Sequence, residues 1–204
     1  MRRTKEEAER TRKQLMDAGV LVFGSKGYAA ARLSDIASGA GVTRGAVYWH
    51  FGSKKGLMFA ILREMANPYI QKALEVLESD LEPDRKIRET VHRVMDAMDR
   101  KKAFLFHEQL ALRFMAEHPD EFREYHGDVS WDMRKVIRLL KRTIRDGQNA
   151  GQIRRDVDAG IITGTIAAVL RGSSIMKSVP KLDLLSRGSS GVVVDLIMKG
   201  LEPR

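Results

Sequence analysis

The chain has 204 residues, no cysteine and a formal net charge of +9 at pH 7. Its length allows a sizeable core without covalent staples, and the missing cysteines exclude disulfides and thiolate metal sites and favour a reducing compartment. Residues 1–60 carry 11 Lys/Arg against 5 Asp/Glu, a net of +6, whereas residues 61–204 carry 25 against 22, a net of +3. This concentration of positive charge indicates either a polyanion partner or a solvated basic surface.

The apolar residues recur at intervals of three and four, which predicts an all-α protein. Thr4 and Glu7 form a capping box that begins the first helix, and Gly24 and Gly27 are the candidates for its end. A short helix is expected over residues 33–39.

The next two helices are predicted to begin at Thr43 and after Ser53, whose hydroxyl serves as an N-cap. The helix after Ser53 should end near Asn67-Pro68, because proline disfavours helical backbone in the residue before it.

Beyond residue 80, proline and glycine divide the chain into further helix candidates. They cover residues 84–100, 102–117, 120–146, 157–176 and 191–201. The candidate over 157–176 has a face of glycine and alanine, although each glycine costs a helix interior up to about 1 kcal/mol. Such a face predicts close packing against another helix, within the chain or across a dimer axis.

No membrane segment is expected. The N-terminal arginines are not followed by an apolar run, so no signal peptide is predicted. The most apolar stretch, residues 157–170, is too short to cross a bilayer and contains Asp158. We therefore expect a soluble, cytoplasmic protein.

Residues 33–52, LSDIASGAGVTRGAVYWHFG, fit a helix-turn-helix. Ala37 provides a small crossing point between the two helices, and Gly41 tolerates the positive φ of the connecting turn. Val42, Ala46 and Val47 are expected to anchor the second helix on the first.

The second of these helices should present one face outward. At about 100° per residue, Arg44, Gly45 and Tyr48 fall together, with Trp49 beside them. Gly45 removes bulk at the centre, which suits a helix that lies against bases or a sugar-phosphate backbone. Alternatively, Tyr48 and Trp49 cover the edge of the core, and His50 satisfies a local hydrogen bond.

The stretch from Arg10 to Met65 resembles the TetR family of bacterial transcriptional repressors, and within it the drug-efflux regulators. The matching segments are Thr11-Arg12, Phe23 followed by Gly27-Tyr28, DIASGAGV and TRGAVYWHFGSKKGL. The resemblance implies a three-helix DNA-binding domain, residues 1–52. A fourth helix would join it to a helical ligand-binding and dimerisation domain, residues 53–204.

The resemblance also implies a set of DNA-contacting residues. These are Thr43, Arg44, Tyr48 and His50 on the operator, Gly45 close to bases, Trp49 beside that face, and Lys54 on phosphate. The family usually has Thr or Ser before the second helix, where this chain has Ala31 and Arg32. Arg32 is therefore the candidate to replace a phosphate contact, and Arg44 is the best candidate for a base edge.

The implied function is repression of a palindromic operator by a homodimer that a small molecule releases. Methionines and aromatic residues in the middle helices suit an apolar or aromatic inducer, although each also fits an ordinary core position. The candidate ligand contacts are Met98, Phe104, His107, Glu108 and Trp131. The candidate dimer contacts on the last two helices are Gly164, Ala168, Gly172, Val194 and Ile197.

Two other classes of function remain open. No nucleophile–base pair, phosphate loop or paired-carboxylate motif indicates an enzyme, and neither a metal nor a cofactor is expected. A basic helical adaptor that binds proteins or anionic surfaces would explain the charge. It would leave the glycine turn and the outward face of Arg44 and Tyr48 without a purpose.

Overall fold

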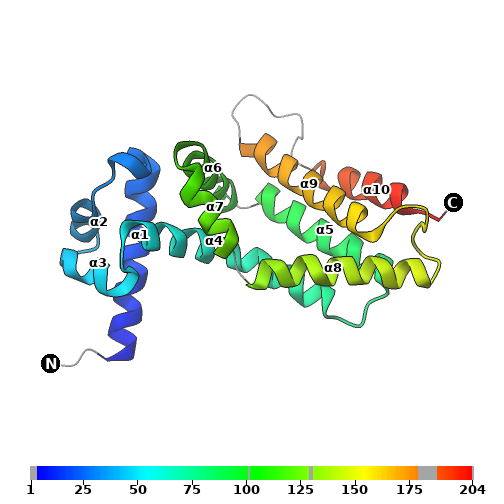
Figure 1. The fold of residues 1–204 in the computed structure, drawn as a ribbon, viewed down its shortest axis with the longest axis horizontal. Coiled ribbons are helices and arrows are strands. Elements are labelled where there is room, and N and C mark those ends of the chain that lie inside the picture. Colours follow the sequence, from blue (N-terminus) through cyan, green and yellow to red (C-terminus); the bar gives the residue numbers. More distant parts are fainter. Residues whose placement is uncertain (1–3, 101, 129–130, 179–187, 204) are drawn as a thin grey trace. The chain divides into compact units, whose positions relative to one another are not determined.

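The computed structural model describes residues 4–100, 102–128, 131–178 and 188–203, and throughout these ranges the regular structure is helical (Figure 1). Side chains are described for these residues except 99–100, 102–105, 107, 125–128, 131–132 and 178. The all-α prediction is confirmed for the described part of the chain. The helices are α1 Lys5–Ala30, α2 Leu33–Gly39, α3 Arg44–Phe51, α4 Lys54–Leu77, α5 Pro83–Arg100, α6 Lys102–Glu117, α7 Pro119–Asp128, α8 Trp131–Asn149, α9 Ala159–Ser178 and α10 Ser190–Leu201.

The chain forms two compact units, and each unit is made of two separate segments of the sequence. Unit 1 consists of residues 1–65 and 110–128, and unit 2 consists of residues 66–109 and 129–204. Helices α4 and α6 each contribute to both units. The functional division into residues 1–52 and 53–204 remains a prediction, because compactness does not reveal which part binds DNA.

Unit 1 is built on the long helix α1. The predicted capping box is present: the Thr4 hydroxyl accepts from the Glu7 amide at 3.2 Å, and the Glu7 carboxylate accepts from the Thr4 amide at 2.9 Å. The expected stop at Gly24 is wrong, because the helix continues through it. The break lies at Gly27, where φ is +77°, and a last turn ends at Ala30.

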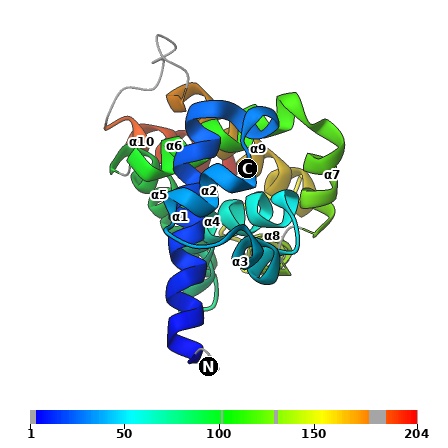
Figure 2. The ribbon, with the colours of Figure 1, turned by 90° about the vertical axis from the view of Figure 1, so that its left-hand side faces the viewer.

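Helices α2, α3 and the first part of α4 pack together with α1. Helix α2 lies against α1, and α3 lies against α2 (Figure 2). A Cβ atom on Gly19 would lie 2.8 Å from Cδ1 of Ile61, so this glycine allows α1 and α4 to approach each other. Fully buried side chains fill the space between these helices, and they include Leu15, Phe23, Ile36, Val47, Leu57 and Leu62.

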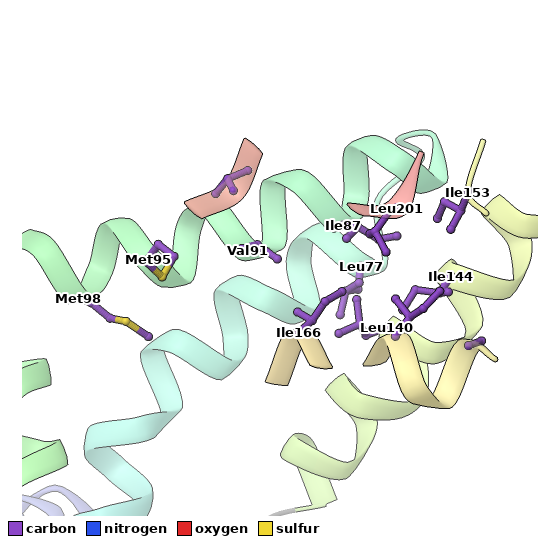
Figure 3. Packing of buried hydrophobic residues seen from close by; sticks show 13 residues of the cluster. Leu77, Ile87, Val91, Met95, Met98, Leu140, Ile144, Ile153, Ile166 and Leu201 are labelled. Atoms are coloured by element: carbon purple, nitrogen blue, oxygen red, sulfur yellow. The ribbon is translucent and has the colours of Figure 1, made fainter. Parts of the chain in front are cut away.

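Unit 2 has a core in which α5 contacts α8, α9 and α10. Buried aliphatic and methionine side chains meet between these helices and the end of α4 (Figure 3). They include Leu77, Ile87, Val91, Met95, Leu140, Ile144 and Ile166. The outer faces of α5 and α8 are rich in charged residues, so each helix has one buried and one solvated side.

Two predicted boundaries in this part of the chain are wrong. Helix α4 does not end near Pro68 but continues to Leu77, because Ile70, Ala73 and Leu77 are buried. Pro68 removes one helical N–H, but both Pro68 and Glu64, four residues before it, are exposed, so water can bind the freed carbonyl. The single helix expected over residues 120–146 is two helices, α7 and α8.

Candidate nucleic-acid interface

The bend between α2 and α3 has the predicted geometry. Gly41 has a φ of +66°, in the left-handed region that favours glycine. The amides of Gly41 and Val42 donate to the carbonyls of Ser38 and Ala37 at 3.1 and 3.0 Å. Ala37 is buried at the crossing point. A short turn therefore fixes the direction in which α3 leaves α2.

Helix α3 buries one side and exposes the other as its spacing predicted. Val47 is fully buried and fixes the helix on the core, while Arg44 and Gly45 are exposed. Tyr48 and Trp49 are exposed by 44% and 72%, so the alternative in which they cover the core edge is excluded for this chain. A basic and aromatic face is thus open to a partner outside unit 1.

Arg44 and Tyr48 form a preorganised pair one helical turn apart. Arg44 Nη2 donates to the Tyr48 hydroxyl at 2.8 Å, and the guanidinium carbon lies 5.4 Å from the centre of the tyrosine ring. A guanidinium has five N–H donors, so this bond leaves donors for a base edge or a phosphate. The pair restricts both side chains without burying them.

The first turn of α3 offers further unobstructed groups. Thr43 occupies the N-cap position, but its side chain makes no capping hydrogen bond, and the residue is exposed. A Cβ atom on Gly45 would meet only Thr43 Oγ1, at 3.7 Å. The protein itself therefore does not require glycine at position 45, which leaves close approach of a partner as a reason for it.

His50 differs from these residues because it is half-buried. Its ring lies edge-on to Trp49 at 4.4 Å between centroids, and 5.9 Å from the ring of Phe51. A direct contact between His50 and DNA remains a prediction of the family resemblance.

The start of α4 is held very close to the end of α3. The Ser53 hydroxyl accepts from the Gly56 amide at 2.9 Å, which agrees with its predicted role as N-cap. A Cβ atom on Gly56 would overlap the carbonyl oxygen of Phe51. Glycine is therefore required at position 56 for steric reasons.

Lys54, the predicted phosphate contact, already has intramolecular partners. Its ammonium donates to the carbonyl of Ala29 at 3.0 Å and lies 4.6 Å from the centre of the Tyr28 ring. Burial lowers the pKa of the Lys54 ammonium from its ordinary value. Sequence reasoning missed both partners, because they lie on α1, some 25 residues earlier.

Arg32 is exposed at the N-cap position of α2 and makes no side-chain capping bond. It is therefore available for the predicted phosphate contact. An ion pair that sequence reasoning did not find joins α1 to α2: Lys26 Nζ lies 2.7 Å from Asp35 Oδ2. The hydrogen bond from Lys26 is the main reason why the pKa of Asp35 is lowered.

The candidate ligand contacts in unit 2 are placed only in part. Met98 is buried in the unit 2 core, and the side chains of Phe104, His107 and Trp131 lie outside the described residues. Glu108 is 4% exposed, and its carboxylate accepts from Arg171 Nη1 at 2.5 Å and from the Ser174 hydroxyl at 2.9 Å. Sequence reasoning missed these two α9 residues because they lie more than 60 positions away.

The candidate dimer contacts fall into two groups. Gly164 and Ala168 are exposed, and Gly172 is partly exposed; a Cβ atom on either glycine would meet nothing within 4 Å. Val194, by contrast, is 2% exposed in the chain's own core, and Ile197 packs against that core. The exposed large apolar residues of the last two helices are Ile161 on α9 and Val192 and Leu196 on α10.

Helix α9 has the expected length but begins and ends two residues later than the predicted range 157–176. Residues 159–177 have a mean hydropathy of 1.4, so by length and composition alone this helix could cross a membrane. Ile162 and Ile166 of α9 are buried in the unit 2 core. Within the described residues, no group of three or more His, Asp or Glu side chains could hold a metal ion.

Known proteins resemble this chain in sequence and in fold. The profile described as "Bacterial regulatory proteins, tetR family" matches residues 15–61. The chain is 30% identical over 211 residues to the HTH-type transcriptional regulator TtgR of Pseudomonas putida, which covers 100% of this chain and 98% of that protein. It is 45% identical over 60 residues to the HTH-type transcriptional regulator AcrR of Shigella flexneri, which covers 29% of this chain and 28% of that protein. The solved SmeT–triclosan complex aligns with a TM-score of 0.72 and 22% identity over 93% of this chain and 90% of that one, a likeness of fold.

Proposed function

The chain belongs to the tetR family of bacterial regulatory proteins, and from this premise we propose that it is a ligand-responsive transcriptional repressor. The observation that carries the proposal is the outward face of α3, where Arg44, Gly45 and Tyr48 are exposed on a helix fixed by the buried Val47. A helix of this kind fits the major groove of B-DNA.

The contacts divide into those that position the protein and those that read sequence. Arg32, Lys54 and the Tyr48 hydroxyl would contact phosphate, which fixes register without distinguishing bases. Arg44 would donate to a base edge, and guanine, with two acceptors in the major groove, suits a guanidinium best. Thr43, Trp49 and His50 would line the same contact.

We further propose that the protein acts as a homodimer. The supporting observation is the open face of α9, where Gly164 and Ala168 are exposed and neighbour the outward Ile161. On α10, Val192 and Leu196 are also exposed apolar residues, and we propose that they belong to the same interface. Because Val194 and Ile197 pack inward, they would support the interface rather than contact the partner copy.

A dimer interface would bury the apolar face of α9, which explains the composition of this helix without a membrane. A cytoplasmic regulator is therefore favoured over a membrane-bound one. A twofold dimer with one recognition helix per copy would bind a palindromic operator. Leu196→Glu should yield monomers in light scattering, whereas Asp195→Ala, which removes only the exposed ion pair with Arg88, should remain dimeric.

The regulatory ligand is proposed by chemical class only. A protein of similar fold has been solved with triclosan, an aromatic molecule, and the apolar core of unit 2, which includes Met95 and Met98, suits an apolar or aromatic inducer. Among the buried polar residues of the described chain, Glu108 carries a charge, and we propose that it responds to the ligand. A ligand donor at this carboxylate would compete with Arg171 and Ser174, which both donate to Oε2, and that competition would bias one state of the repressor over another.

The proposal is tested by in vitro selection of duplex DNA from a random pool with the full chain. A repressor of this kind should enrich a palindrome, and Arg44→Ala should lose preference at one position of each half-site. If no sequence is enriched, while heparin and anionic vesicles bind as tightly as DNA, the basic adaptor is the better description.

A further inference from the structure

Lys54 differs from Lys26 and Lys55 of unit 1, whose ammonium groups pair with carboxylates, because its ammonium is held by a backbone carbonyl and an aromatic ring. It donates to the Ala29 carbonyl at 3.0 Å, in the last turn of α1, where helical carbonyls lack partners within the helix. It also lies 4.6 Å from the centre of the Tyr28 ring, within the range of a cation–π interaction. An ammonium has three N–H donors, so two are left for another acceptor.

The Tyr28 ring is itself held by other aromatic rings of unit 1. Phe114 and His118 contact it in T-shaped arrangements, with centroids 4.8 and 4.7 Å away, and Phe23 lies 5.7 Å away. Aromatic pairs at these distances are favourable and geometrically specific. The tyrosine therefore gives the lysine a rigid platform.

A lysine has a flexible stem, and ordering it on a ligand costs conformational entropy. We propose that Tyr28 is a positioning residue for DNA binding: its ring, with the Ala29 carbonyl, holds the Lys54 ammonium where it meets a phosphate. The inference rests on the proposed function. Tyr28 acts through Lys54 and makes no DNA contact of its own.

The charges around the pair agree with this role. Burial, and to a lesser extent the charge of Glu121, raise the pKa of the Tyr28 phenol, so the ring stays neutral. The neighbouring Lys55 is engaged differently, since its ammonium lies 2.8 Å from the Glu124 carboxylate. Lys55 is thus a matched control with the same charge, one residue away, without the aromatic platform.

The test is the salt dependence of binding by the full chain to a duplex recovered by in vitro selection. Each phosphate contact contributes about 0.9 to the slope of log affinity against log salt concentration. Tyr28→Leu should lower the slope by about this amount, as should Lys54→Ala, and the double variant should lower it no further. Tyr28→Phe, which keeps the ring, and Lys55→Ala should retain the wild-type slope.

Phe59→Leu controls for damage to packing, because the Phe59 ring lies against Phe114 in the same aromatic cluster; it should retain the wild-type slope. A wild-type slope in Tyr28→Leu overturns the inference, as does an equal loss in Lys55→Ala and Lys54→Ala. If wild-type protein binds the duplex and Lys54→Ala leaves the slope unchanged, the inference fails while the proposed function stands. If wild-type protein selects no duplex, the proposed function fails.

A measurement on the wild-type chain covers the case in which Tyr28→Leu does not fold. NMR relaxation of the lysine ε-methylene groups should show Lys54 more ordered than Lys72, which is exposed. Equal mobility of the two side chains would overturn the inference without any substitution and without DNA.

Discussion

The outward face of α3 and the inner face of α6 hold their charged groups in opposite ways. Arg44 is paired with Tyr48 at the surface, where both are exposed, so an outside partner can bind without first breaking into a core. Glu108 is 4% exposed and bound by Arg171 and Ser174, so a ligand that reaches it competes with partners already in place. The first arrangement suits immediate recognition, and the second suits a switch.

The largest loss of stability is expected from a substitution at Gly56, where the structure has no room for a side chain. Gly56→Ala would place a methyl group against the Phe51 carbonyl, and relief requires backbone movement at the start of α4. We expect a loss of about 3 kcal/mol or more in the free energy of unfolding, with loss of DNA binding. Chemical denaturation followed by circular dichroism measures the first effect. An unchanged midpoint would show that α3 and α4 are not held as closely as described.

Arg44→Ala should affect recognition and leave folding intact, because the side chain is exposed. The expected cost is about 1–3 kcal/mol of discrimination at one base position, read from competition binding with single-base variants of the selected duplex. Thermal unfolding should be nearly unchanged. A uniform loss at all positions would instead assign Arg44 to phosphate.

Arg171→Ala tests the buried side of the comparison. It takes the guanidinium away from the Glu108 carboxylate and leaves the hydrogen bond from the Ser174 hydroxyl, and we expect a loss of about 1–2 kcal/mol in unfolding free energy. Adding Glu108→Gln should recover part of this loss, because the buried charge is then removed. If the double variant is less stable than Arg171→Ala, the carboxylate is not the source of the cost.

Gly45→Ala should change stability only slightly, and in the opposite direction from Gly56→Ala. Outside its own stretch of helix, the nearest atom to the added carbon is Thr43 Oγ1 at 3.7 Å, and alanine favours helix by about 1 kcal/mol over glycine, so the free energy of unfolding should rise slightly. Affinity for the selected duplex should nevertheless fall, because the methyl group meets the partner. Gains in both stability and affinity would contradict a close approach of DNA at this position.

Local sequence determined much of the recognition region and little of the regulatory one. The turn at Gly41, the anchor at Val47 and the open face of Arg44 and Tyr48 each depend on residues within one turn of helix, so a pattern could predict them. The partners of Lys54 and Glu108 could not be predicted, because they come from helices distant in the sequence.

Errors in the helix boundaries have a similar origin. Pro68 predicts a local break, but the burial of Ile70, Ala73 and Leu77 keeps α4 helical beyond it. From its spacing, Val194 could equally contact a second copy or enter the core of its own chain. The structure buries it in that core. In both cases the spacing of apolar residues allowed two arrangements, and tertiary packing determined which one formed.

The central claim is that α3 presents its exposed face to a DNA groove, and the absence of cysteine from the chain allows a direct test. Trp49→Cys, tagged with a DNA-cleaving iron chelate, should cut the selected duplex within both half-sites. Leu21→Cys on α1 has the same native exposure of 72% and is the matched control, which should cut weakly. Cleavage from position 49 that is no stronger or more localised than from position 21 would contradict the account.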